Sequence, residues 1–246
     1  MWACLKVLCV AAAAVCAASC AAPGAARGAA PGAVLAQIGP PTAPPAGLAA
    51  LCVRRPDICP TSSAVRRTAA GPQEALFQAL LLSERTPAPR RDGVALTAER
   101  AALLADVNAR INRAMTFTTD AEAVGVDERW SFPLTAPDAP TRAGRVRGDC
   151  EDFALEKRAA LLAAGWPAEH LSLATAYAPQ LGLHAVLIAH TDEGDIALDM
   201  LRATPVSVAR LGYRWIAAQR GADLLTWRVV RLVGLSEMDV APRIGA

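Results

Sequence analysis

The architecture of this chain is most readily inferred from one segment, Gly148-Asp-Cys-Glu-Asp-Phe-Ala-Leu-Glu-Lys-Arg158. This segment opens a predicted helix over 150–164, because apolar residues recur at helical spacing and Gly165 suits the turn after a helix. Asp149 precedes the helix and is suited to be its N-cap. The segment therefore places a cysteine, Cys150, at the beginning of a helix.

Three apolar stretches of strand length follow this helix. They span 171–178, 184–190 and 195–200, and Thr191 to Gly194 form the turn between the last two. A weaker strand is expected over 227–233. One helix followed by several strands, without regular alternation, predicts an α+β fold with an antiparallel sheet.

Two helices are expected before the cysteine segment. One covers 73–83, and the other runs from Ala98 to about Met115 with Thr97 as its cap. Residues 116–146 carry turn signals and prolines, so we expect a long surface loop there. A loop of that length within a compact domain is commonly functional.

The N-terminal region has the pattern of an export signal. Within residues 1–22 an apolar run, too short to span a bilayer comfortably, is followed by small residues. A cleaved signal is the first expectation, and lipid attachment at Cys20 or an uncleaved anchor are the alternatives. Residues 23–47, rich in Ala, Pro and Gly, are expected to form a flexible linker. The folded domain should then span 48–235, with a tail at 236–246, and the chain should work outside the cytoplasm.

Composition argues against several classes of protein. The sequence is 53% hydrophobic, but much of the excess is alanine near the N-terminus. A formal net charge of +2, without a basic stripe and interleaved aromatic residues, does not favour nucleic-acid binding. The sequence has no dinucleotide fingerprint or phosphate loop, so a nucleotide cofactor is not expected either.

The cysteines fall into three groups. Of seven, four lie in the predicted signal, and Cys52 and Cys59 are a simple disulfide pairing in an oxidising compartment. A disulfide that closes so short a loop should stabilise in the lower part of the usual range of about 2–4 kcal/mol. Cys150 is left as the odd thiol, which is either a buried structural residue or a residue with a function.

The surroundings of Cys150 act on its thiol in opposite directions. A helix N-terminus favours the thiolate, through unsatisfied N–H groups and the positive end of the helix dipole. The neighbouring carboxylates of Asp149, Glu151 and Asp152 disfavour it. Chemistry at Cys150 would therefore need a positive group nearby: an imidazolium, Arg147 or a bound cation.

His184 and Asp199 are the expected partners of this thiol. Side chains alternate along strands, so two residues on a hairpin lie on the same face only when the register of the strands matches. If the loop at 191–194 has an even number of residues, the numbers of two paired residues add up to an odd total. The numbers 184 and 199 also add up to an odd total, so the side chains of His184 and Asp199 would lie on the same face of the sheet. A loop with an odd number of residues would place them on opposite faces. Asp199 also lies in an apolar run, where an unpaired carboxylate is unfavourable. A satisfied core histidine is the alternative for His184, and His170 and His190 are expected at the surface.

The acidic residues beside Cys150 allow two interpretations. Asp149, Glu151 and Asp152 offer oxygen ligands of the kind that Ca²⁺ prefers. Alternatively, these carboxylates cap the helix and interact favourably with its dipole. The calcium interpretation would also supply the positive group that thiolate chemistry needs.

Taken together, these motifs resemble the bacterial transglutaminase-like cysteine peptidases, whose best-known members are LapG-type periplasmic proteases. The resemblance rests on the segment 148–158, on His184-Ala-Val-Leu187 and on Leu198-Asp199. It extends over roughly 50–230 through three further matches: Val107-Asn-x-x-Ile-Asn112, Asp127-x-x-Trp130-x-x-Pro133 and Tyr213-x-Trp215-Ile-x-x-Gln219 with Trp227. Two positions depart from the family pattern, Met200 where Asn is frequent and Phe117 where Tyr is common, and neither removes a catalytic group.

The resemblance implies a transglutaminase-like (papain-like) fold with N-terminal helices. In it, a catalytic cysteine at a helix N-terminus packs on an antiparallel sheet that carries the histidine and the aspartate. It implies Cys150 as nucleophile, His184 as general base and acid, and Asp199 as the orienting carboxylate. The Cys150 backbone N–H would contribute to an oxyanion hole, and the Trp130 indole is a candidate second donor.

By the same resemblance, Asp149 and Glu151 are implied calcium ligands. The expected protein is then an exported, calcium-dependent cysteine peptidase that acts as a monomer on a protein substrate. A cell-surface adhesin is a candidate substrate, and an inner-membrane regulatory receptor is a candidate partner. Two alternatives remain: an acyl transferase of the transglutaminase type, which would hand the acyl group to an amine, and a non-catalytic calcium-binding module.

Overall fold

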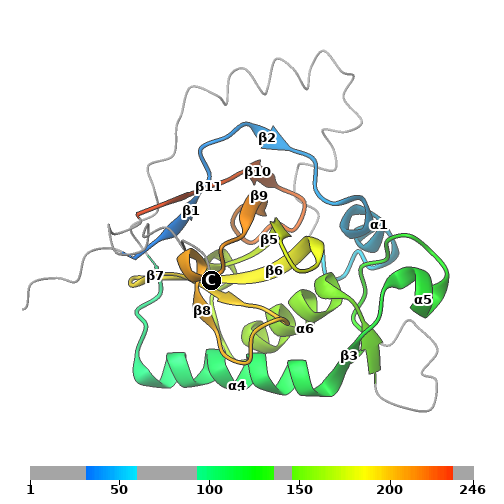
Figure 1. Ribbon diagram of the computed structural model, residues 1–246, viewed down its shortest axis with the longest axis horizontal. Coiled ribbons are helices and arrows are strands. Elements are labelled where there is room, and N and C mark those ends of the chain that lie inside the picture. The colour runs from blue at the N-terminus through cyan, green and yellow to red at the C-terminus, as the bar shows by residue number, and fades with distance from the viewer. Residues whose placement is uncertain (1–31, 60–92, 136–145, 235–246) are drawn as a thin grey trace, which may run out of the picture.

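The computed structural model describes residues 32–59, 93–135 and 146–234 (Figure 1). The predicted signal, the helix expected at 73–83 and the C-terminal tail lie outside these residues. The described part has the expected α+β architecture, with a seven-stranded sheet in the order β2-β10-β9-β5-β6-β7-β8 whose neighbours all pair antiparallel. Its strands are β2 (Pro41–Thr42), β5 (Leu171–Ala178), β6 (Gly182–Thr191), β7 (Gly194–Leu198), β8 (Val206–Ser207), β9 (Arg214–Gln219) and β10 (Trp227–Val229).

Two small sheets and a set of helices complete the fold. The antiparallel pair is β1 (Val34–Ala36) with β11 (Arg231–Val233), and the parallel pair is β3 (Met115–Phe117) with β4 (Val146–Gly148). The helices are α1 (Ala46–Arg54), α4 (Ala98–Ala114), α5 (Asp120–Val124) and α6 (Cys150–Ala163), with 3-10 turns η1 (Ala168–His170) and η2 (Val208–Arg210). Helix α6 packs on β6, and α4 packs on α6. Figure 1 shows both helices on the same side of the central sheet.

The two long helices begin where the sequence predicts. The Thr97 hydroxyl accepts a hydrogen bond from the Arg100 N–H and caps α4, as expected. Asp149 occupies the N-cap position of α6, but its side chain makes no capping hydrogen bond. Its carboxylate lies instead among other acidic groups, within 4.8 Å of carboxylate oxygens of Asp120 and Glu151. The expected capping role of the Asp149 side chain is therefore wrong.

The predicted linker at 23–47 is wrong where the structure describes it. Strands β1 and β2 and the start of α1 fall within 32–47. Leu35 is buried, and its backbone N–H donates to Oδ2 of Asp195 at 2.7 Å. Strand β1 also pairs with β11, with Val34 opposite Val233. Composition could not indicate this strand, because its partners lie more than 150 residues away in the sequence.

Two further segments differ from expectation. The long loop expected over 116–146 contains the end of β3, helix α5 and the start of β4, and residues 136–145 lie outside the described part. The strand expected over 227–233 is divided at Val230, because β10 pairs with β9 and β2 while β11 pairs with β1. The segment between β7 and β10 provides β8, η2 and β9.

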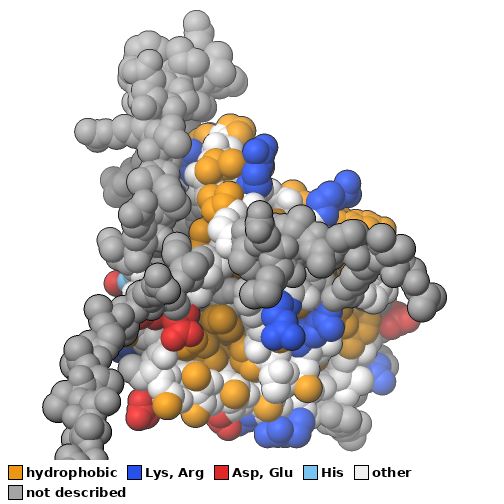
Figure 2. Space-filling view, turned by 60° about the vertical axis from the view of Figure 1, so that its left-hand side comes forward, with side chains coloured by type: hydrophobic (Ala, Val, Ile, Leu, Met, Phe, Trp, Pro, Cys, Tyr) orange, Lys and Arg blue, Asp and Glu red, His pale blue; other side chains and the backbone are white. Residues whose placement is uncertain are grey.

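The central sheet separates two hydrophobic clusters. Along β6, Leu187 belongs to the cluster on the helical side and Ile188 to the cluster beneath β1 and η2, as alternation along a strand requires. Among the described residues, none of the helices combines the length and apolarity that crossing a membrane would take. On the face shown in Figure 2, basic side chains lie interspersed among hydrophobic ones.

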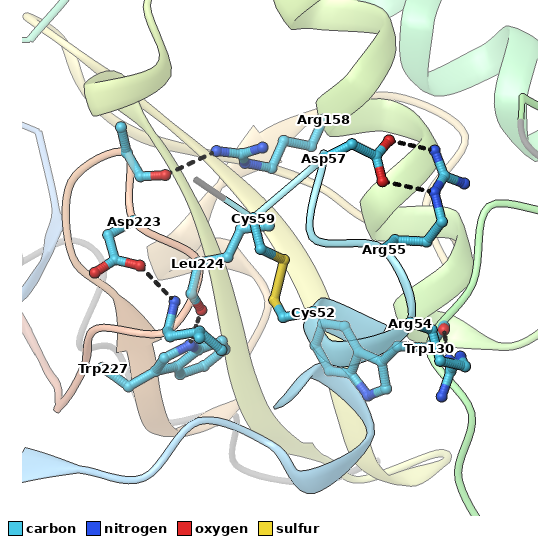
Figure 3. Close-up of a disulfide and its surroundings, with 12 residues drawn as sticks. Cys52, Arg54, Arg55, Asp57, Cys59, Trp130, Arg158, Asp223, Leu224 and Trp227 are labelled. Carbon is cyan, nitrogen blue, oxygen red and sulfur yellow. Dashed lines mark hydrogen bonds and ion pairs between the residues drawn. A yellow bond between two sulfur atoms is a disulfide. The ribbon is translucent and has the colours of Figure 1, made fainter. Parts of the chain in front are cut away.

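The expected disulfide joins Cys52 of α1 to Cys59 (Figure 3). Both cysteines are buried in the helical-side cluster. Within the short loop that they close, the Arg55 guanidinium binds both carboxylate oxygens of Asp57, at 3.0 and 2.8 Å. Cys150 is left as a free thiol, as the cysteine count predicts.

Candidate active site

Cys150 is the first residue of α6, and two groups contact its sulfur. The thiol donates to Oε2 of Glu151 at 3.2 Å, and the backbone N–H of Ala185 donates to Sγ at 3.3 Å. The sulfur is thus held between the start of α6 and strand β6. Residue 185 directly follows His184, so the thiol lies beside the expected histidine.

The position of the thiol follows from an opening in the sheet. Strand β7 pairs with β6 only from Leu187, opposite Leu198, onwards. Backbone N–H groups two residues apart on a strand point to the same edge. The Ala185 N–H therefore points to the edge that β7 no longer covers, and Cys150 Sγ takes the place of a strand acceptor there.

His184 and Asp199 form a buried pair. Nε2 of His184 lies 2.8 Å from Oδ1 of Asp199, and neither side chain is exposed. The hairpin register explains the contact. Leu187 pairs with Leu198 and Thr191 with Gly194, so paired numbers sum to an odd total. The shared face predicted for the two residues is confirmed, with Asp199 immediately beyond the end of β7.

Further hydrogen bonds fix the Asp199 carboxylate. The Tyr213 hydroxyl donates to Oδ2 at 2.6 Å, and the Leu201 N–H donates to Oδ1 at 2.9 Å. Burial alone would raise the pKa of this carboxyl, but the contacts with His184 and Tyr213 outweigh burial and hold the pKa below its usual value. Asp199 is therefore a carboxylate at neutral pH, suited to orient an imidazole.

The imidazole of His184 retains one nitrogen for chemistry. Its Nδ1 is buried and has no hydrogen-bond partner in the structure. The Asp199 contact favours the tautomer with the proton on Nε2, which leaves Nδ1 as an acceptor. The Tyr213 ring meets the imidazole edge-on, with centroids 5.7 Å apart, and limits its rotation. Tyr213 thus supports both partners of the pair, a role that its place in a recognised motif did not reveal.

The thiol itself is held in its protonated form in this arrangement. Burial raises the pKa of Cys150, and the adjacent Glu151 carboxylate raises it further. The Ala185 N–H acts in the opposite direction but does not compensate. Neutralising the charge of Glu151 would remove one of the two main causes of the raised pKa of Cys150, and burial would remain the larger one.

Three carboxylates meet beside the thiol. Oxygens of Asp120, Asp149 and Glu151 all lie within 4.8 Å of one another. Burial and the Glu151 carboxylate raise the pKa of Asp149, and its Oδ1 is buried without a hydrogen-bond partner in the structure. Clustered buried carboxylates with a spare oxygen fit a divalent cation, since oxygen is the ligand that Ca²⁺ prefers. The predicted ligands Asp149 and Glu151 are thus brought together.

Asp120 is a member of this cluster that the sequence did not single out. It lies in the first turn of α5, within the segment expected to be a loop. The pattern Thr119-x-x-Glu122 is a capping-box signature and would have indicated the helix, because the Thr119 hydroxyl accepts from the Glu122 N–H. Asp120 also accepts the Arg129 N–H, which ties α5 to the following segment.

Asp152 is not in the cluster and has a different task. Its Oδ1 accepts hydrogen bonds from the backbone N–H and the hydroxyl of Ser131. One turn later, Glu156 accepts the N–H groups of Leu134 and Thr135. Burial, followed by the Asp149 charge, raises the pKa of Asp152 to about 8. These two carboxylates of α6 hold the segment 131–135 against the helix.

Trp130 does not supply the oxyanion donor that we expected. Its indole N–H donates to Oε1 of Glu128 at 2.9 Å, and the side chain is buried. Figure 3 shows Trp130 near α1, where Arg54 donates to its carbonyl at 2.9 Å. The expectation failed because the carboxylate of Glu128, only two residues away, accepts the hydrogen bond of the indole N–H.

A second histidine is also not placed as expected. His190 lies between Ser172, whose Oγ is 2.8 Å from Nε2, and Asp195, whose Oδ1 is 2.7 Å from Nδ1. Ser172 is only 1% exposed, so this chain of contacts is closed to a substrate. Because Asp195 also binds the Leu35 N–H, we regard the network as a support for β1.

The geometry around Cys150 permits acyl-group chemistry. A thiol at a helix N-terminus, a neighbouring imidazole with an open nitrogen, and a carboxylate on the other nitrogen form the arrangement that activates a nucleophile. The N–H groups at the start of α6 can face an oxyanion.

Comparisons with solved structures find proteins from Legionella pneumophila. The chain is similar to calcium-bound LapG, at 26% identity and a TM-score of 0.39, over 48% of this chain and 64% of that one. A second LapG structure gives 27% identity and a TM-score of 0.40, over 48% and 63%. EGTA-treated LapG gives 22% identity and a TM-score of 0.40, over 71% and 82%. The first two matches span less than two thirds of LapG.

Among curated proteins, none matches the chain. The family model described as bacterial transglutaminase-like cysteine proteinase matches residues 83–233, which is more than half of the chain. This range contains the cysteine, the histidine, the aspartate and the acidic cluster. The chain belongs to the family of bacterial transglutaminase-like cysteine proteinases.

Proposed function

We propose that the chain is an exported, calcium-dependent cysteine peptidase. Cys150 is the nucleophile, His184 the general base and acid, and Asp199 the residue that orients the imidazole. One observation carries the proposal: Cys150 Sγ is bound by the N–H of the residue after His184, whose Nε2 is held by Asp199 and whose Nδ1 is without a partner. Nδ1 is thereby left to accept the thiol proton.

The reaction then follows the chemistry of thiol nucleophiles. The proton of Cys150 passes to Nδ1 of His184, and Sγ attacks the carbonyl carbon of a peptide bond. The negative oxygen that forms is stabilised by the N–H groups at the beginning of α6. His184 returns its proton to the leaving amine, and water releases the acyl group from the sulfur.

Calcium enters the proposal through the acidic cluster. Asp120, Asp149 and Glu151 would hold the ion, which would supply positive charge beside the thiol. Glu151 is the acceptor of the Cys150 thiol and one cause of its raised pKa. A cation on Glu151 therefore favours the thiolate, because it offsets the nearest negative charge.

The substrate and the site of action are part of the proposal. We infer a periplasmic location from the signal-like residues 1–22, and the Cys52–Cys59 disulfide is in keeping with an oxidising compartment. A cell-surface adhesin is the proposed substrate, an inner-membrane receptor the proposed regulator, and a monomer the proposed active form.

The decisive experiment compares the full chain with a Cys150→Ala variant on an extract of periplasmic and surface proteins. With added Ca²⁺, mass spectrometry of new N-termini should find cuts that Cys150→Ala, His184→Ala and Asp199→Ala do not make. Circular dichroism should show that all three variants remain folded. Cuts that persist in the Cys150 variant would contradict the proposal.

The same samples separate hydrolysis from acyl transfer. A labelled primary amine should remain in solution if water releases the acyl group, and should become attached to protein if an amine does. Alkylation of Cys150 by iodoacetamide at neutral pH should be faster with Ca²⁺ than with EGTA. A thiol that stays inert in both conditions would favour a non-catalytic binding module.

A further inference from the structure

We propose that Leu183, Tyr177 and Arg214 form a substrate-binding row beside the thiol, which selects polypeptides with an apolar and an acidic residue near the cut. This inference rests on the proposed peptidase function. The three residues lie on neighbouring strands. Tyr177 on β5 pairs with Leu183 on β6 and, at its other edge, with Arg214 on β9. They therefore form a row across β6, β5 and β9.

The row faces the side of the sheet on which α6 lies. On β6, Ala185 and Leu187 belong to the helical-side cluster, and Leu183 continues the same alternation. On β5, Leu171 and Leu173 belong to that cluster, and Tyr177 continues their alternation. Leu183 is two residues from Ala185, whose N–H binds Cys150 Sγ. The row thus extends this face outward from the thiol.

All three side chains are exposed, although two are large and hydrophobic. Leu183 is 74% exposed and Tyr177 is 43% exposed, whereas His184 beside them is buried. The Arg214 guanidinium lies over the Tyr177 ring, 5.3 Å from its centroid. Among the described residues, no acidic side chain forms an ion pair with Arg214. The ring thus orients a cation that has its donors available to a ligand.

The chemistry of the row indicates its occupant. An exposed apolar group next to a nucleophile can bury a side chain of the chain being cut, and an oriented guanidinium can bind a carboxylate in two places. Two residues along β6 correspond to about 7 Å, and three neighbouring strands span about 10 Å. An extended substrate advances about 3.3 Å per residue, so its apolar residue lies about two residues from the cut bond and its acidic residue about four.

The test uses the full chain with Ca²⁺ and a library of unstructured synthetic peptides that varies acidic, basic and apolar residues at each position. Mass spectrometry identifies the cuts, and Cys150→Ala defines those that depend on the thiol. Asp or Glu should be enriched about four residues from these cuts, with rates roughly fivefold above those of Lys-containing counterparts, as one exposed ion pair provides. The preference should decrease in high salt, which screens exposed charges.

Variants of Arg214 complete the design. Arg214→Glu should reverse the preference toward Lys and Arg, and Arg214→Lys should retain a weaker acidic preference. Leu183→Ser should remove the apolar preference alone. Arg231→Glu, an exposed arginine on β11, is the matched control and should change neither.

The outcomes separate the two proposals. If no cut depends on Cys150, the proposed function fails, and this inference fails with it. If Cys150-dependent cuts occur without acidic enrichment and are unchanged in Arg214→Glu, only the inference is overturned.

Discussion

Tyr213 donates its hydroxyl to the oxygen of Asp199 that His184 leaves free, at 2.6 Å. The carboxylate is thereby fixed from two sides, and the imidazole inherits that orientation. We predict that Tyr213→Phe lowers kcat/KM about tenfold, because one hydrogen bond to a charged group is lost while the ring remains. Kinetic assays on a cleaved peptide would measure this. Circular dichroism should show that the variant is folded, and equal activity of Tyr213→Phe and the wild type would contradict the prediction.

Asp120 should matter for calcium as much as the two carboxylates next to the thiol. We predict that Asp120→Asn weakens Ca²⁺ binding at least tenfold, because it removes one of three clustered carboxylates. Isothermal titration calorimetry on the full chain would measure the affinity. Asp127→Asn, an exposed neighbour, should bind Ca²⁺ like the wild type. An unchanged affinity in Asp120→Asn would exclude this residue from the site.

Lys157 should make stability depend on pH. Burial lowers its pKa from 10.5 to about 7, against the attraction of Asp199. Between these values the unfolded chain binds a proton that the folded chain does not, so the free energy of unfolding should rise with pH.

Relative to Lys157→Met, the wild type should gain up to about 4 kcal/mol between pH 7 and pH 10. Urea unfolding at several pH values would test this. Parallel pH profiles of the two proteins would mean that Lys157 is charged in the fold throughout.

Trp130 should be dispensable for chemistry. Its indole N–H is engaged by Glu128, so Trp130→Phe should cost about 1 kcal/mol of stability and leave kcat within about twofold. Thermal unfolding and peptide cleavage are the measurements. A loss of kcat by a factor of about a hundred, with stability preserved, would restore the indole as an oxyanion donor.

The Cys52–Cys59 disulfide should contribute modestly to the stability of the fold. Cys52→Ser with Cys59→Ser should lower the free energy of unfolding by about 2 kcal/mol, because the bridged residues are only seven apart. Denaturant curves with and without a reductant would give the value, and the reductant should not affect the double variant. A catalytic effect of the double variant at low temperature is not expected, since the bridge closes only a short loop beside α1.

The contact between His184 and Asp199 was predictable because it depends only on whether the loop of a hairpin has an even or an odd number of residues. A tight turn at 191–194 sets the register, and the register determines which residues share a face. Helix α6 was predictable for a similar reason, since its period and its terminal glycine are local signals. The location of Cys150 at the helix start followed directly.

The features that could not be predicted depend on competition between hydrogen-bond acceptors or on partners that are distant in the sequence. Trp130 lost its expected role because Glu128 accepts its only donor, a choice between acceptors that spacing does not reveal. Strand β1 lies in a segment whose composition suits a linker, and it forms because β11 and Asp195 are there to pair with it. The place of Asp120 could not be predicted because α5 is only five residues long, and the fold, not the local sequence, brings its carboxylate to Asp149 and Glu151.

The pairing of β1 with β11 has a mechanical consequence. Because the strands are antiparallel, residue 32 and residue 234 emerge at the same end of the pair. Tension between these two points would break the hydrogen bonds between β1 and β11 one after another, starting at this end, and not all at once. Besides the pairing with β11, the strand is held by two hydrogen bonds with Asp195, through the Leu35 N–H and the Ala33 carbonyl. Cys150, His184 and Asp199 are all on other elements, so a pull on the N-terminal segment would be relieved before it reached them.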